Sequence, residues 1–281
     1  MAGIVVVFDF DSTIIECDSD NWVLDETGLT EKFYELLPTT LWNPLMDRMM
    51  GELHSEGKTI EEIVEILKRT PLNPRIVHAI EAAYSLGCDL KIVSDANMFF
   101  IETILKHHGV RDCFSEIIAN PSHVNEEGRL RISPFHDYKK SSHGCTLCPP
   151  NMCKGEIIER IQNFLSKEGK KKFIYLGDGN GDFCPSLKLK ESDYLMPRKE
   201  FPLSDLVSKN SNKIKAEVHA WKDGEELENV LVHIINKEIE GNKINNINST
   251  TPKISIDCKL GSIPTDATPH QPLPKPLPVR H

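Results

Sequence analysis

The chain has 281 residues, of which 39% are hydrophobic and 27% charged, a composition typical of a soluble globular protein with one large or two smaller domains. Its formal net charge of −9 argues against nucleic acid or an anionic membrane as the main partner, because both bind basic surfaces. There is no signal peptide and no apolar run of transmembrane length, so we expect a cytoplasmic protein whose eight cysteines do not form a disulfide scaffold.

The first predicted strand covers residues 3–8 and is apolar and rich in β-branched residues, as in a parallel sheet covered by helices on both faces. It ends in Asp9 and Asp11, with the hydroxyl of Thr13 two residues further on. Ligands of open α/β sheets bind beyond the carboxyl ends of the strands. Two adjacent carboxylates repel each other without a cation, which indicates a site for a hard metal, Mg²⁺. A solvated acidic turn is the alternative that this stretch alone leaves open.

The region from residue 20 to 86 has helical patterns throughout. Proline, capping residues and apolar spacing predict helices over 30–37, 43–53, 60–67 and 74–87. The first of these helices begins with Thr30 as its cap, and Thr59 with Glu62 forms a capping box for the third. An all-helical segment is therefore inserted between the first strand and the next.

Two further strands also end in polar residues. The strand predicted over 89–93 ends in Ser94 and Asp95, and the strand over 173–176 ends in a Gly-Asp-Gly-Asn-Gly-Asp stretch that contains Asp178 and Asp182. Between these strands, Lys154 opens a helix that continues to residue 165. Because the carboxyl ends of parallel strands share one edge of the sheet, these side chains are predicted to meet.

The remaining segments complete an alternating pattern. A helix is predicted over 99–107, strands within 112–135 around a hairpin turn at 125–128, short strands over 194–196 and 214–218, and a last helix over 224–239. From residue 241 the composition changes to Asn, Ser, Thr, Lys and Pro, so we predict that 241–281 is a disordered tail.

The order of Asp9-x-Asp11-x-Thr13, Ser94, Lys154 and Gly177-Asp178-x-x-x-Asp182 resembles the four motifs of haloacid-dehalogenase-like phosphohydrolases. The resemblance implies a doubly wound, mostly parallel, Rossmann-like α/β sheet with a helical cap after the first strand. It places the catalytic core at 1–19 and 87–240 and the cap at 20–86.

The same resemblance implies a role for each motif residue. Asp9 is the nucleophile that forms an aspartyl-phosphate, and Asp11 is the proton donor and acceptor. Ser94 and Lys154 bind the phosphoryl group. The Mg²⁺ ligands that it implies are Asp9, the backbone carbonyl of Asp11, Asp178 and, in support of the shell, Asp182.

Longer strings around these motifs resemble the phosphoethanolamine/phosphocholine phosphatase branch, which includes plant thiamine phosphate phosphatase-like proteins and pyridoxal-phosphate-phosphatase-related proteins. This branch implies that Asp20 and Asp95 bind the cationic end of a small phosphate substrate, to which Trp22 could add a cation–π face. Helix capping by Asp20 and core packing by Trp22 are the structural alternatives. The competing functions are an inorganic pyrophosphatase and a phosphate-binding protein that has lost activity.

A second cluster, formed by His143, Cys145, Cys148 and Cys153, has a spacing suggestive of zinc. Structural zinc sites usually have two closely spaced pairs, and the sequence has one here, so free thiols are favoured. The partner that we expect is a small-molecule phosphate, with no nucleic acid and no membrane; the sequence indicates no protein partner.

Overall fold

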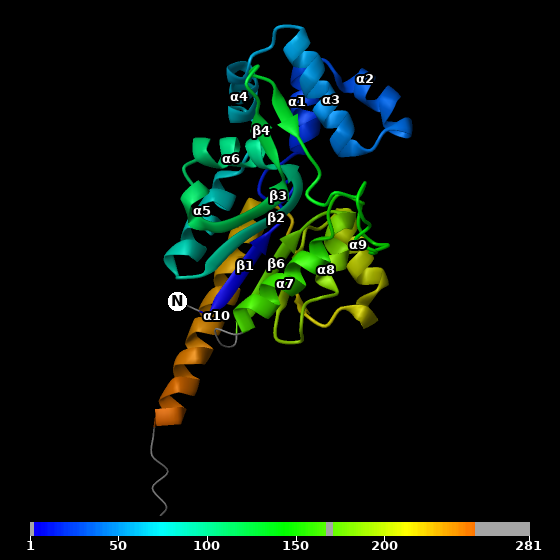
Figure 1. The fold of residues 1–281 in the computed structure, drawn as a ribbon. Helices are drawn as coiled ribbons and strands as arrows, with labels where there is room; N and C mark the ends of the chain where they lie inside the picture. The colour runs from blue at the N-terminus through cyan, green and yellow to red at the C-terminus, as the bar shows by residue number, and fades with distance from the viewer. Residues whose placement is uncertain (1–2, 167–170, 251–281) are drawn as a thin grey trace, which may run out of the picture. The chain divides into compact units, whose positions relative to one another are not determined.

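The computed structural model describes residues 3–166 and 171–250, with only the backbone for 166 and 242–250. Its main sheet has six strands (Figure 1). Their order is β3 (Phe114–Asn120), β2 (Asp89–Asn97), β1 (Ile4–Phe8), β6 (Lys172–Gly177), β7 (Tyr194–Pro197) and β8 (Glu217–Val218). Every neighbouring pair is parallel, which confirms the predicted doubly wound α/β sheet.

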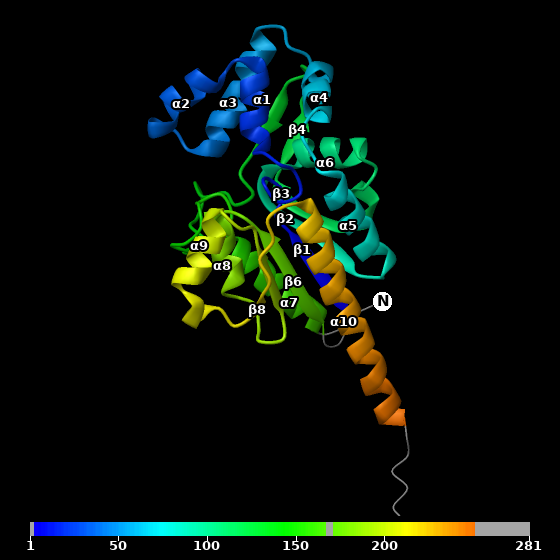
Figure 2. The same ribbon diagram turned by 180° about the vertical axis from the view of Figure 1, so that it is seen from behind.

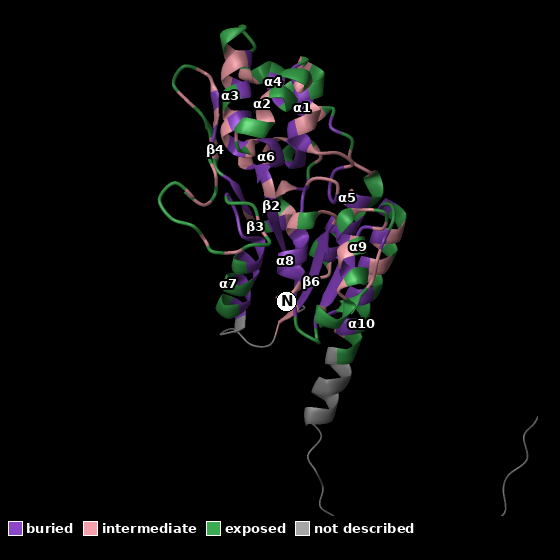
Figure 3. Cartoon of the chain, turned by 90° about the vertical axis from the view of Figure 1, so that its right-hand side faces the viewer, coloured by how far each residue is buried: buried purple, intermediate pink, exposed green. Residues whose placement is uncertain are grey.

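The central strand β1 is buried along its whole length because helices cover both faces of the sheet. Val6 and Phe8 belong to one apolar core, whereas Val5 and Val7 belong to the other. This division follows from the alternation of side chains along a strand. Figure 3 shows the strands as largely buried and the outer faces of the helices as exposed.

Each face of the sheet has its own layer of helices, which Figures 1 and 2 show from opposite sides. The core on one face contains residues of α7 (Lys154–Ser166), α8 (Phe183–Ser186) and α9 (Pro202–Lys209). The core on the other face contains residues of α5 (Pro74–Ser85), α6 (Met98–His107) and α10 (Gly224–Thr250). The amino end of α7 therefore starts at the edge of the sheet where the parallel strands end.

The cap region consists of α1 (Ser19–Thr27), α2 (Thr30–Leu36), α3 (Trp42–Ser55) and α4 (Ile60–Lys68). A 3₁₀ turn over Leu37–Thr39 follows α2, and the Thr59–Glu62 capping box of α4 is confirmed. The predicted cap at Thr30 is wrong: Leu29 takes the N-cap position, and the Thr30 hydroxyl bonds to Asp25. The helix over 74–87 is observed as α5, and it lies beside β2 rather than with α1–α4 (Figure 1).

An antiparallel hairpin of β4 (Ser122–Val124) and β5 (Leu130–Ile132) contacts α3. Asp47 of α3 joins the two parts, since its carboxylate accepts hydrogen bonds from Arg131 Nε at 2.9 Å, Arg129 Nη2 at 3.0 Å and the Ile132 N–H at 2.9 Å. Burial raises the pKa of Asp47, but these arginines and the backbone N–H outweigh burial and lower it. Residues 3–241 thus form one compact unit, and its division into core and cap domains stays a prediction.

The last helix extends beyond the predicted limit of residue 239, to Thr250. The chain has no proline between Gly224 and Pro252, and Gly241 alone costs about 1 kcal/mol in a helix interior, so nothing in this stretch stops the helix. The helix thus continues into the segment predicted as a disordered tail, which stays a prediction, and residues 251–281 of that segment lie outside the described residues. Within the described ranges, no helix is both long and apolar enough to cross a membrane.

Candidate active site

Asp9 and Lys154 form the centre of the candidate site at the carboxyl end of β1. Lys154 Nζ lies 2.8 Å from Asp9 Oδ2 and 2.9 Å from Asp182 Oδ1. All three side chains are buried, and the lysine is only 3% exposed. The structure therefore brings together a nucleophile candidate, a cation and a motif aspartate from three separate parts of the sequence.

Asp182 has all four of its acceptor positions occupied. Its Oδ1 accepts from Lys154 and from the Tyr175 hydroxyl at 2.6 Å, and its Oδ2 accepts from the N–H groups of Asp178 at 3.1 Å and Gly179 at 3.0 Å. Burial raises the pKa of Asp182, but the Lys154 ammonium and the Tyr175 hydroxyl outweigh burial and lower it. An ionised carboxylate bonded in this way holds the loop after β6 and keeps no free lone pair for a metal. Tyr175, which sequence reasoning missed, is one of its anchors.

The other acids provide a place for a cation. Carboxylate oxygens of Asp9 and Asp178 lie within 4.8 Å of each other, and the fully bonded Asp182 carboxylate lies beside both as a supporting neighbour. Burial, followed by repulsion from Asp182, raises the pKa of Asp178 to about 7 and the pKa of Asp9 well above its ordinary value. A hard divalent cation relieves this repulsion, and carboxylate oxygens are the ligands that Mg²⁺ prefers, so the residues present fit Mg²⁺. The Thr13 hydroxyl, 3.3 Å from Asp178 Oδ1, orients that ligand.

Asp11 follows Asp9 by two residues, and a tight loop turns its side chain toward the start of the cap helix α1. Ser12 has a positive φ of 51°, and Asp11 Oδ1 accepts from the N–H of Ser19 at 2.9 Å, at the start of α1. Burial, followed by the charges of Asp18 and Asp20, raises the pKa of Asp11 well above its ordinary value. A raised pKa favours the protonated form of this carboxyl group, which fits the predicted role of proton donor.

A cavity of about 510 Å³ opens beside Asp11. Its lining includes four carboxylates and an aromatic ring, from Asp11, Asp18, Asp20, Asp95 and Trp42. Asp20 is 7% exposed, and it accepts hydrogen bonds from Trp42 Nε1 at 2.7 Å and Asn97 Nδ2 at 3.4 Å. Burial, with a contribution from Asp18, raises the pKa of Asp20 to about 7. Asp18, not Asp20, caps α1.

The aromatic residue at the cavity is Trp42, whereas Trp22 packs against the core, the structural alternative that the sequence offered for it. Trp22 donates to the Ile66 carbonyl at 3.1 Å and packs against the core on the cap side. Trp42 reaches the cavity because its ring packs edge-on against Phe33, with ring centroids 4.9 Å apart, at the start of α3. Sequence reasoning had no signal for this, because the direction of Trp42 depends on how α2 and α3 pack together.

The motif residues Ser94 and Asp95 lie in the last part of β2, and Asp95 also lines the cavity. Asp95 Oδ1 accepts from Asn151 Nδ2 at 3.0 Å, and Asn151 also donates to Asn120 Oδ1 at 3.3 Å. Ser94 is buried, and its Oγ accepts from the N–H of Ala96 at 3.2 Å, which fixes the turn that carries it. Asn151 and Asn120 were not predicted as site residues, since only the fold brings them to Asp95.

Arg198 is a further residue that the sequence did not single out. It follows β7, and its Nη1 donates to the Ser12 carbonyl at 2.6 Å while its Nη2 pairs with Glu16. Its guanidinium lies over the rings of Phe201 and Trp221, at 4.6 and 5.0 Å from their centroids. Arg198 therefore holds the loop that follows Asp11, without touching the Asp9 or Asp11 carboxylate in any contact described.

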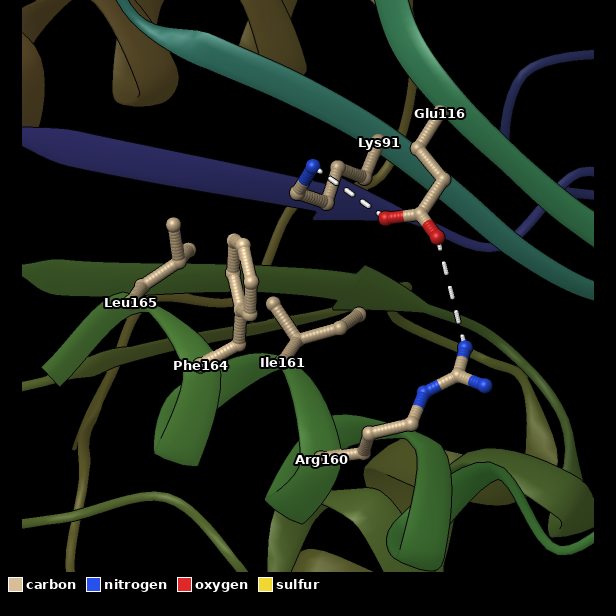
Figure 4. Close-up of a pocket in the computed structure, with 6 residues that line it drawn as sticks. All are labelled: Lys91, Glu116, Arg160, Ile161, Phe164 and Leu165. Atoms are coloured by element: carbon tan, nitrogen blue, oxygen red, sulfur yellow. Dashed lines mark ion pairs between the residues drawn. The ribbon is translucent and has the colours of Figure 1, made fainter. Parts of the chain in front are cut away.

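A separate cavity of about 250 Å³ lies toward the far end of α7 from Lys154 (Figure 4). Glu116 is paired there with Lys91 at 3.3 Å and with Arg160 at 4.0 Å. The other lining residues are apolar, from Ile161, Phe164 and Leu165. Because its acid and bases pair with one another, this cavity offers no catalytic group comparable to the Asp9 site.

Comparison with known proteins agrees with this arrangement. A family described as "Putative Phosphatase" matches residues 4–235. The chain is 61% identical over 236 residues to "Inorganic pyrophosphatase 2" of Arabidopsis thaliana, covering 84% of this chain and 85% of the relative. It is 52% identical over 236 residues to the "Thiamine phosphate phosphatase-like protein" of the same plant, covering 84% of this chain and 96% of the relative.

A solved structure supports the fold. The "Phospho-Aspartyl Intermediate Analogue of Phosphoserine phosphatase" is similar with a TM-score of 0.52 and 17% identity, covering 80% of this chain and 96% of that one. At this identity the likeness concerns the fold alone. The family match and the Arabidopsis relatives show that the chain belongs to the "Putative Phosphatase" family and is a phosphatase, and its fold is that of haloacid-dehalogenase-like enzymes.

Proposed function

We propose that the enzyme hydrolyses the phosphate ester of a small cationic molecule, with Asp9 as the nucleophile. The observation that carries this proposal is the acidic wall of the cavity, where Asp18, Asp20 and Asp95 lie beside the Asp11 side of the site. A phosphate bound near Lys154 would extend its organic end toward these carboxylates. Phosphoethanolamine, phosphocholine and thiamine monophosphate are substrates of this chemical class.

The reaction has two balanced steps. An Asp9 oxygen attacks phosphorus, the bond from phosphorus to the leaving oxygen breaks, and Asp11 gives that oxygen its proton. Asp11 then takes a proton from a water molecule whose oxygen attacks the aspartyl-phosphate, which releases phosphate and restores Asp9. The raised pKa of Asp11 supports its first role, since the carboxyl must be protonated when the alcohol leaves.

The groups around Asp9 would balance the negative charge of the phosphoryl group. Lys154 already neutralises Asp9 at 2.8 Å and is placed to contact a phosphoryl oxygen, while the Ser94 hydroxyl would donate to another. Asp9, the Asp11 carbonyl and Asp178 would hold Mg²⁺, and Asp182 would orient Lys154 and the Asp178 loop. When bound, Mg²⁺ supplies positive charge against the phosphoryl oxygens.

Inorganic pyrophosphate is the second candidate substrate. It is supported by the relatives, because "Inorganic pyrophosphatase 1" of Arabidopsis thaliana is also 62% identical over 229 residues, covering 81% of this chain and 78% of that protein. The acidic wall argues against it, since free pyrophosphate carries no cationic end to pair with Asp20. The inactive alternative loses its basis, because the chain is a phosphatase and Asp9, Asp11 and Lys154 are all in place.

The test compares substrates and variants. The ratio of kcat/KM for phosphocholine, phosphoethanolamine or thiamine monophosphate to that for neutral p-nitrophenyl phosphate should fall about ten- to hundredfold in Asp20→Asn, because a charge-assisted contact is worth ~1.5–3 kcal/mol. Asp95→Asn should act in the same direction, and Asp25→Asn, on the exposed side of α1, should leave the ratio unchanged. Ratios within threefold of wild type in both site variants, with pyrophosphate the best substrate, would favour the pyrophosphatase.

The nucleophile has its own test. Asp9→Asn should lower turnover of every substrate more than a hundredfold while the fold is kept, because an amide cannot form the acyl-phosphate. In Asp11→Asn, mass spectrometry after incubation with p-nitrophenyl phosphate should find phosphate on the peptide that contains Asp9. Phosphate on another residue, or appreciable turnover by Asp9→Asn, would contradict the mechanism.

A further inference from the structure

Four cysteines from three segments converge behind the candidate site. Cys145 and Cys148 lie in the loop before α7, Cys153 directly precedes α7, and Cys184 is in α8. Their sulfur atoms all lie within 4.8 Å of one another, and Cys153 and Cys184 are buried. The fold thus supplies Cys184 as the fourth sulfur, which the sequence spacing did not indicate.

The sulfur–sulfur distances match one kind of site. Cys184 Sγ lies 3.7 Å from Cys145 Sγ and 4.0 Å from Cys153 Sγ. Tetrahedral zinc with Zn–S bonds of ~2.3 Å places its sulfurs ~3.8 Å apart. A disulfide requires ~2.05 Å. The four sulfurs are therefore spaced as they are around a zinc ion, and not as in two disulfides.

His143, which the sequence spacing placed with these cysteines, is not part of this group. Its Nε2 is hydrogen-bonded to the Pro149 carbonyl at 2.9 Å, and its Nδ1 accepts from the N–H of Cys145 at 3.1 Å. With both ring nitrogens occupied, the histidine instead shapes the loop that carries Cys145 and Cys148. The earlier set of His143 with three cysteines is thus corrected to four cysteines.

Neighbouring backbone groups fit a thiolate cluster. The N–H of Glu156 points at Cys153 Sγ at 3.4 Å, a type of contact that stabilises metal-bound thiolates. A Cβ atom on Gly155 would lie 2.5 Å from Cys184 Sγ, so the start of α7 can approach that sulfur only with glycine at this position. The close packing of α7 on α8 therefore depends on Gly155 at the place where the sulfurs meet.

We propose that Cys145, Cys148, Cys153 and Cys184 bind one structural Zn²⁺. A four-thiolate set leaves no open position, which is the mark of a structural rather than a catalytic zinc. The ion is distinct from Mg²⁺ at Asp9, because thiolates select zinc and carboxylates select magnesium. Cys153 is next to Lys154, and Cys184 is two residues after Asp182, so the zinc would fix the two chain segments whose side chains pair at 2.9 Å.

The test measures metal content directly. The full chain, purified without added zinc under reducing conditions, should contain about one zinc per chain by elemental analysis, and titration of its thiols should release that zinc to a colorimetric chelator. Cys148→Ser and Cys184→Ser should lose it, whereas Cys113→Ser, outside the cluster, should keep it. Replacement by Co²⁺ should give the visible absorption of tetrahedral cobalt thiolate, whatever the enzyme's activity.

Two results would contradict the proposed zinc site. Less than a tenth of a zinc per wild-type chain after growth with zinc, with these thiols free or Cys145 and Cys184 joined as a disulfide by mass spectrometry, would overturn the proposal. Because the wild-type zinc content decides the matter, poor folding of a cysteine variant does not weaken the test. Full zinc content in soluble Cys184→Ser would also refute the four-cysteine set.

Discussion

Asp20→Asn should make the enzyme more stable at alkaline pH while it impairs substrate recognition. Burial raises the pKa of Asp20 from 3.8 to about 7, so the fold disfavours its ionised form. The stability that this carboxyl contributes is present below its unfolded pKa and is lost as the pH rises through about 7. At pH 8 the difference corresponds to about 4 kcal/mol, at 1.36 kcal/mol for each pKa unit.

Asparagine at position 20 removes this charge but leaves one hydrogen-bond donor without an acceptor. Both partners of Asp20 are donors, Trp42 Nε1 and Asn97 Nδ2, and an amide can accept from only one of them. Asn97 cannot turn its amide around, because its Oδ1 accepts from the N–H of Phe100 at 3.1 Å and caps α6. An unsatisfied buried donor costs ~1–3 kcal/mol. The net gain is therefore about 2 kcal/mol at pH 8, or ~4–8 °C in Tm for a chain of this size.

Thermal unfolding of wild type, Asp20→Asn and Asp25→Asn without added Mg²⁺ measures this gain. At pH 5 the folded protein keeps Asp20 protonated, and taking up that proton on folding costs only about 1.6 kcal/mol, so the cost of the unsatisfied donor cancels the gain and the Tm values should nearly coincide. Asp25→Asn removes the same charge from the exposed side of the same helix and should change Tm little at either pH. An Asp20→Asn variant that melts at or below wild type at pH 8, or that gains equally at both pH values, would refute the reasoning.

Three other substitutions test how the site is held. Tyr175→Phe removes the buried 2.6 Å hydrogen bond to Asp182. We expect the free energy of unfolding, measured in urea, to fall by ~1.5–3 kcal/mol and kcat/KM to fall about tenfold. An unchanged kcat/KM would show that this hydrogen bond does not matter for catalysis. Asp47→Ala removes the contact between α3 and Arg131 and should lower the free energy of unfolding by ~1–3 kcal/mol. It should also raise KM more than it lowers kcat, and a loss of kcat alone would contradict a role of Asp47 in positioning the cap. Arg198→Lys keeps the charge but cannot contact the Ser12 carbonyl and Glu16 at the same time. In steady-state assays kcat should therefore fall at nearly constant KM. A wild-type kcat would argue against the positioning role of Arg198.

The convergence of the motif residues was predictable because local rules determine it. An apolar run that ends in Asp9 must be a strand end, and parallel strands place their carboxyl ends along one edge of the sheet. Ser94 lies in β2 and Asp178 directly follows β6, the two strands that pair with β1, so their convergence follows from the strand order. Lys154 is at the first turn of α7, and the strand-to-helix connection brings that turn to the same edge.

The substrate-binding side of the site could not be predicted, because contacts between distant segments determine it. Trp22 and Trp42 both lie on cap helices, and nothing in their neighbours tells which ring faces the cavity; the packing of Phe33 against Trp42 decides it. Cys184 likewise has no paired cysteine nearby in the sequence and joins the cluster only through the contact of α7 with α8. In the proposed function, phosphoryl transfer thus rests on short motifs, whereas the choice of substrate would rest on how the cap helices pack above them. Small changes in cap packing would then redirect Trp42 or Asp20 and alter substrate choice while Asp9, Asp11 and Lys154 stay unchanged.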